Sequence, residues 1–199
     1  MNRKTALRFA IGVVAVVGIW LLFFALPKWY GPQRPGEVPE GPKPAEAIRR
    51  ITATLFYVSA DGLNLVGVQR EVPFGGTTAD QARRIVEEQI KPAPAGHLTA
   101  IPSATSLRGL YVTVRGEAYV DLSKDVVDKH TGGSLDEVFA VYAIVNAVTA
   151  NLPAIERVQI LVDGKEVDTL AGHIDLRRPL RKNLAWSDAP EAMSDDANR

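Results

Sequence analysis

The sequence predicts an α+β fold: a two-layer sandwich in which three β-hairpins form an antiparallel or mixed sheet and two helices pack on one of its faces. Three stretches alternate apolar and polar residues around a glycine turn, at Asp61-Gly62, Arg115-Gly116 and Asp163-Gly164. This pattern is typical of hairpins with one buried face. Two segments with helical spacing of apolar residues lie between them. One transmembrane helix is expected to precede the sandwich.

The first hairpin covers residues 52–69, and the first helix follows at "TTADQARRIVEEQI", residues 77–90. Thr77 or Thr78 can cap the free amides at its start, and Pro92 ends it. The second hairpin, "LYVTVRGEAYVDL", covers residues 110–122.

The second helix is expected at residues 134–152, where Ser134 and Glu137 form a capping-box pattern. It is apolar nearly all round and should be the central core helix. The third hairpin, "VQILVDGKEVDTLAGHIDL", covers residues 158–176. We expect it to close with a terminal strand at residues 171–176, with His173 and Asp175 on the polar face.

Residues 9–26 contain no charged side chain and would span roughly 27 Å as a helix, close to the thickness of a bilayer core. Arg3, Lys4 and Arg8 precede them, so the positive-inside rule places the N-terminus in the cytoplasm and the rest outside. A cleaved signal peptide is the alternative, but Phe23 lies two residues before Ala25 and fits a cleavage site poorly.

The predicted organisation is a cytoplasmic end and transmembrane helix at residues 1–26, a stalk at 27–47, a folded domain at 48–184 and an acidic disordered tail at 185–199. Six prolines and three glycines within residues 27–44 favour an extended stalk. The chain has 23 basic and 23 acidic side chains, so no nucleic-acid partner is expected. The absence of cysteine excludes disulfides, thiol catalysis and a lipid anchor on cysteine.

An ordered series of motifs runs through the predicted domain. It comprises Leu55-Phe56-Tyr57, Ala100-Ile101-Pro102 with Thr105 and Leu107, Val120-Asp121-Leu122-Ser123, Asn146, "DGK" at 163–165 and "HIDLRRPL" at 173–180. Over about residues 51–180 this series resembles the GerMN domain family of sporulation and spore-germination proteins. The resemblance implies a small extracytoplasmic bacterial domain, not known as an enzyme, with a fold like that of ring-building domains and a role in envelope assembly.

Ser123, His173 and Asp175 are of the residue types that form a nucleophile, base and acid. No GxSxG elbow surrounds the serine, which more simply ends a strand by bonding nearby backbone. A hydrolytic site is therefore weighed but not assigned.

A metal site would have to recruit the three histidines, with Asp121 or Asp175 as a further ligand. The histidines are His97, His130 and His173, and no pair has ligand spacing such as HxxxH. Gly75-Gly76 precede a helix, but no phosphate-loop pattern surrounds them. No catalytic, cofactor-binding or metal-ligating residue is assigned, and no cofactor is expected.

The sequence thus predicts a single-pass protein of the bacterial inner membrane whose non-catalytic extracytoplasmic domain binds an envelope protein or peptidoglycan. Formation of a homo-oligomer is left open as a further alternative. Arg177-Arg178 and Arg181-Lys182 form a basic cluster that is either a solvated rim or a contact for anionic wall polymer. The alternative function is a cell-wall hydrolase accessory or a weak hydrolase acting on the wall.

Overall fold

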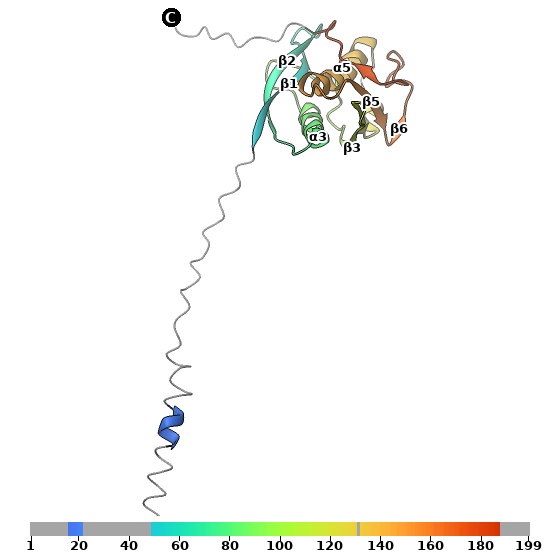
Figure 1. The fold of residues 1–199 in the computed structure, drawn as a ribbon. Coiled ribbons are helices and arrows are strands. Elements are labelled where there is room, and N and C mark those ends of the chain that lie inside the picture. The colour runs from blue at the N-terminus through green and yellow to red at the C-terminus, as the bar shows by residue number, and fades with distance from the viewer. Residues whose placement is uncertain (1–15, 22–48, 131, 188–199) are drawn as a thin grey trace, which may run out of the picture. The chain divides into compact units, whose positions relative to one another are not determined.

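The computed structural model describes residues 16–21, 49–130 and 132–187 (Figure 1). Contacts divide the chain into two units, Met1–Ala47 and Ile48–Arg199. Within the first unit, residues 16–20 are helical. None of the helices found in these ranges is long and apolar enough to cross a membrane. Most of the predicted transmembrane segment, the stalk and nearly all of the tail lie outside the described residues.

The strands form two sheets, so the prediction of one sheet made of three hairpins is wrong. β1 (Arg50–Val58) and β2 (Leu65–Pro73) pair with each other in an antiparallel ladder. The second sheet has the order β3-β4-β5-β6, with β7 also paired to β5. Its strands are β3 (Leu107–Val112), β4 (Glu117–Leu122), β5 (Arg157–Val162), β6 (Lys165–Glu166) and β7 (Leu180–Arg181). β4 and β5 run parallel, and the other pairs are antiparallel.

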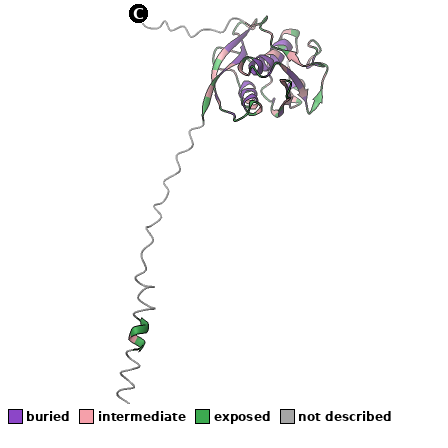
Figure 2. Ribbon diagram, in the orientation of Figure 1, coloured by how far each residue is buried: buried purple, intermediate pink, exposed green. Residues whose placement is uncertain are grey.

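The described residues of this unit form three helices: α3 (Thr78–Gln89), α4 (Asp125–Asp128) and α5 (Ser134–Asn151). Thr77 caps α3 as predicted, because its hydroxyl accepts a hydrogen bond from the Asp80 amide at 3.1 Å. α5 contacts β1 of the first sheet and β5 and β7 of the second. It is buried along most of its length (Figure 2), which confirms that it is the central core helix.

The predicted capping box at the start of α5 does not form. Gly133 is the residue before the helix, and no side chain caps the helix there. The Glu137 carboxylate instead accepts hydrogen bonds from backbone amides of residues 170–173. A buried carboxylate gains more from several amide donors than from one capping bond, and this outcome could not be seen in local sequence.

The turn of the third hairpin is confirmed, but its return strand is short. Asp163 and Gly164 both have positive φ, 51° and 75°, as a type I′ turn requires. The strand after the turn is only β6, and residues 171–176 form no strand. Their backbone is engaged elsewhere: the Leu176 amide donates to the Asp168 carbonyl, and the Leu176 carbonyl accepts from Gln159.

Substitution of Gly164 by valine is expected to destabilise the domain by about 1 kcal/mol or more, because a β-branched residue resists positive φ. Asp163→Asn should change stability by less than about 0.5 kcal/mol, because asparagine tolerates this conformation and the exposed Arg108–Asp163 ion pair contributes little. Urea unfolding of both variants measures the difference. A valine variant as stable as the wild type would contradict the type I′ assignment.

Candidate functional site

The three residues weighed as a hydrolytic set are each engaged in a separate local contact. The Ser123 hydroxyl accepts a hydrogen bond from the Ser106 amide at 3.1 Å. His173 Nδ1 lies 3.0 Å from Glu137 Oε2. Hydrogen bonds from Arg177 lower the pKa of Asp175 to about 2, so this carboxylate is ionised and paired. The structure therefore gives each residue a structural partner and does not join the three in a relay.

The other histidines and the glycine pair also make local contacts. His97 Nδ1 lies 3.4 Å from the Ala95 carbonyl, and His130 Nδ1 accepts from the Gly132 amide at 3.0 Å. Within the part of the chain that the structure describes, no group of three or more acidic or histidine side chains is placed to hold a metal ion. The Gly75 amide donates to the Gln81 side chain, which gives the glycine pair a structural explanation.

Side-chain amides from two helices cover the free edge of β1. Gln89 of α3 accepts from the Phe56 amide at 2.9 Å and donates to the Phe56 carbonyl at 2.7 Å. Asn151 of α5 makes the same pair of bonds to Thr54, at 2.8 and 2.7 Å. Leu98 completes the series through two backbone bonds to Val58. Every second residue of this edge is thus satisfied as if another strand lay beside it, which explains why β1 does not join the second sheet.

Two further side-chain amides hold the C-terminal segment in place. Asn146 of α5 donates to the Asn183 carbonyl at 2.8 Å and accepts from the Asn183 amide at 3.0 Å. Gln159 of β5 donates to the Leu176 carbonyl at 2.5 Å. These bonds pin residues 176–183 against the core, beside the point where β7 pairs with β5.

Glu137 is the most heavily engaged polar residue of the site. It has 0% relative exposure, and its carboxylate accepts from the amides of Leu170 (2.8 Å), Ala171 (2.9 Å) and His173 (2.7 Å). Burial alone would raise the pKa of Glu137, but the three amide bonds and His173 outweigh it and hold this pKa below its ordinary value. The ionised carboxylate organises the 170–173 loop.

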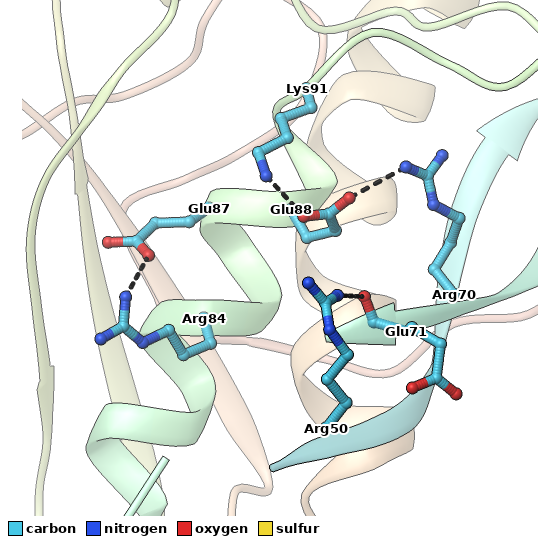
Figure 3. Close-up of polar contacts among 7 residues, drawn as sticks. All are labelled: Arg50, Arg70, Glu71, Arg84, Glu87, Glu88 and Lys91. Carbon is cyan, nitrogen blue, oxygen red and sulfur yellow. Dashed lines mark hydrogen bonds and ion pairs between the residues drawn. The ribbon is translucent and has the colours of Figure 1, made fainter. Parts of the chain in front are cut away.

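Glu88 links α3 to the first sheet. Its carboxylate lies 2.9 Å from Arg70 Nη2 and 2.6 Å from Lys91 Nζ (Figure 3). The Arg84–Glu87 pair in the same view is more exposed, with 50% and 38% of the two side chains accessible. Only Glu88 is close to full burial, with 11% of its side chain exposed, so it fixes the helix more firmly than the surface pair does.

A shallow hollow of about 280 Å³ lies next to the Glu137–His173 contact. Its lining is mostly apolar and comes from the start of α5, the 173–174 loop and Trp186. The Trp186 carbonyl accepts from the Leu65 amide at 2.7 Å, so the indole is carried by ordered backbone. Among the described residues that line this hollow, His173 is the one with an ionisable side chain.

Fold and site together define a small mixed-sheet α+β domain in which buried polar side chains hold backbone segments in place. The chain belongs to the family described as "Germane: Sporulation and spore germination", whose model matches residues 54–168. This is the GerMN-type domain that the ordered motifs predict. A search of curated proteins found no match.

Solved structures show a similar fold. The first GerMN domain of the sporulation protein GerM from Bacillus subtilis is 20% identical with a TM-score of 0.50, over 67% of this chain and 96% of that one. The tandem GerMN domains of the same protein give 18% and 0.50, over 68% of this chain but only 46% of that one. A putative lipoprotein from Clostridium perfringens gives 25% and 0.49, over 68% and 90%. The alignment with the first GerMN domain shows that the described domain has the fold of one GerMN unit.

Proposed function

We propose that this protein is a non-catalytic domain, anchored to the cytoplasmic membrane and exposed outside it, that binds a protein partner or a cell-wall polymer during envelope assembly. One observation supports the non-catalytic part of this proposal: the three candidate residues each bond to a different neighbour. The pairs are Ser123 with Ser106, His173 with Glu137, and Asp175 with Arg177. A nucleophile and base need to reach one another, and these side chains hold backbone or neighbouring charges instead.

The proposed location rests on the charge and hydropathy of the N-terminal segment. Residues 9–26 are long enough to span a bilayer core as a helix, and Arg3, Lys4 and Arg8 favour a cytoplasmic N-terminus. The proline-rich residues 27–47 would then hold the domain at 48–184 away from the membrane surface, with residues 185–199 as a solvated acidic tail. Membership of a sporulation and germination family fits an envelope role.

A reporter enzyme that is active only outside the cytoplasm, fused after Arg199, is expected to be active in cells. The fusion should also stay with the membrane after alkaline extraction, because the anchor is uncleaved. Activity from a cytoplasmic reporter alone would overturn the location. A soluble extracytoplasmic fusion would instead indicate a cleaved signal peptide.

The catalytic alternative is tested separately with purified peptidoglycan. The full-length chain is expected to release no soluble wall fragments, because Ser123 is held by the Ser106 amide and His173 by Glu137. Release that disappears in Ser123→Ala would overturn the proposal in favour of a wall hydrolase. Enhancement of an added amidase would support the accessory role that the sequence left as an alternative.

A further inference from the structure

In its β3–β4 part, the second sheet turns one face toward the core and the other toward solvent. Along β4, Ala118, Val120 and Leu122 are buried, and the residues between them point to the opposite face. On that opposite face Tyr119 of β4 lies directly across from Tyr111 of β3. Directly opposed residues of neighbouring strands lie about 5 Å apart, so the two tyrosines stand side by side on the solvent face.

Tyr111 is an exposed ring supported by a glycine. It is 66% exposed. A Cβ added at Gly109 would lie 3.2 Å from Cε2 and 3.3 Å from the hydroxyl of Tyr111, so the ring lies against this glycine. Glycine leaves the space that the ring occupies, and much of the ring surface stays open to solvent. On β5, Gln159 is in register with Tyr119. Its side chain donates to the Leu176 carbonyl and is covered, so the exposed surface of the two tyrosines ends at β5.

Two arginines lie in the next row of this face, Arg157 diagonally across from Tyr119 on β5 and Arg181 one strand further on β7. The neighbouring row of the same face carries Glu117, Arg157 and Arg181 in register across β4, β5 and β7. Arg157 Nη1 lies 3.8 Å from Glu117 Oε1, and Arg181 Nη1 lies 3.7 Å from Glu156 Oε2. Both distances exceed hydrogen-bond length, so guanidinium donors remain for a ligand. Arg181 belongs to the basic cluster recognised in the sequence, and the sheet places it beside Arg157.

We propose that this solvent face binds a short segment of an anionic cell-wall glycan, whose sugars bear carboxylate or phosphate groups. Tyr111 and Tyr119 offer rigid rings for the C–H face of the sugar and phenol groups for its hydroxyls. Arg157 and Arg181 offer the planar donor fork that matches carboxylate or phosphate. The inference rests on the proposed function and names the wall polymer and its contact surface.

A second protein fits this face less well. A stable protein interface buries about 800 Å² on each partner around a largely apolar core. Two tyrosine side chains provide roughly 300–500 Å² even if both were fully buried, and charged residues follow directly in the next row. A short glycan segment, with one sugar on the tyrosines and an anionic group toward β5 and β7, matches both the small aromatic area and the arginines in the next row.

The test uses the full-length chain in mild detergent and two insoluble probes. One probe is peptidoglycan sacculi that keep their attached anionic glycopolymer, and the other is the same sacculi after acid has removed that polymer. The wild type is expected to co-sediment with the first probe at least about tenfold more tightly than with the second, because the arginines need the anion. Equal binding to both probes would overturn the anionic assignment.

Variants assign the binding to this face. Tyr111→Ala and Arg181→Gln are each expected to weaken binding to the first probe by about fivefold or more, whereas Tyr111→Phe should keep most of it because the ring remains. Arg84→Gln, an exposed arginine of α3, is the matched charge control and should bind like the wild type. Wild-type binding by Tyr111→Ala would overturn the proposal.

Two further outcomes separate this inference from the proposed function. Concentration-dependent self-association lost in Tyr111→Ala would assign the face to a second copy and overturn the glycan site. Absence of any glycan binding, together with an active extracytoplasmic reporter, would overturn this inference while leaving a protein partner as the function. An inactive extracytoplasmic reporter would overturn the proposed function itself.

Discussion

Replacing Glu137 by alanine is expected to destabilise the domain by about 4 kcal/mol or more. The carboxylate accepts three backbone amides, and each hydrogen bond to a charged group contributes about 1.5–3 kcal/mol. Glu137 has 0% relative exposure, so water cannot easily replace the lost acceptor. The variant also leaves a small cavity at the start of α5. Urea unfolding of the purified chain measures the loss.

Two controls make this prediction specific. Glu137→Gln keeps one acceptor oxygen and the size of the side chain, so its loss should be clearly smaller than that of alanine. Glu87→Ala removes an exposed glutamate of α3 and should cost less than about 0.5 kcal/mol. If Glu137→Ala stayed within 1 kcal/mol of the wild type, the amide contacts would not organise the 170–173 loop.

The same residue predicts how stability depends on pH. The pKa of Glu137 is lowered in the folded chain, because the amide bonds and His173 outweigh the effect of burial. A carboxylate with a lowered folded pKa stabilises fully above its unfolded pKa of about 4.3. That contribution is lost as the pH falls through the lower folded value. The acid decline in stability should therefore be shallower for Glu137→Gln than for the wild type.

The parts of the fold that local chemistry determines were predictable from the sequence. Asp163-Gly164 forms its turn because the two residues tolerate positive φ, and Thr77 begins α3 because its hydroxyl reaches the Asp80 amide. α5 is the core helix because it is apolar on nearly all sides. Each of these predictions depends on residues a few positions apart.

The parts decided by long-range side-chain bonds were not predictable. Asn151 bonds to Thr54 across 97 positions, and Gln89 bonds to Phe56 across 33. These contacts close the edge of β1 and split the expected single sheet in two. Polar residues within otherwise apolar helices were the available signal, but nothing in the sequence showed which backbone they would meet.

The candidate surface depends on strand register in the same way. Tyr111 and Tyr119 lie on opposite sides of one turn, so their pairing could be expected from the second hairpin. Arg157 and Arg181 join them only because β5 runs parallel to β4 and because β7 returns to pair with β5. A hairpin-only sheet would have placed these arginines elsewhere, so no local pattern predicted that they would share a face with the tyrosines.

The edge of β1 provides the second large expected effect, at Gln89. The side chain is fully buried and satisfies both the amide and the carbonyl of Phe56, at 2.9 and 2.7 Å. Alanine at this position would leave two buried backbone groups without partners, each at a cost of about 1–3 kcal/mol. It would also open a cavity between α3 and the sheet.

Gln89→Ala is therefore expected to destabilise the chain by about 3 kcal/mol or more in urea unfolding, whereas Gln69→Ala should change stability by less than about 0.5 kcal/mol. Gln69 is exposed on β2, so it controls for loss of a glutamine side chain without loss of the bonds to β1. Amide hydrogen exchange gives a second measurement. The Phe56 amide should exchange faster in Gln89→Ala, whereas the Thr54 amide should keep more of its protection because it is bonded to Asn151. Equal exchange at both amides in the variant would show that the β1 edge opens as one unit. Wild-type stability of the variant in urea would show that Gln89 does not protect the β1 edge.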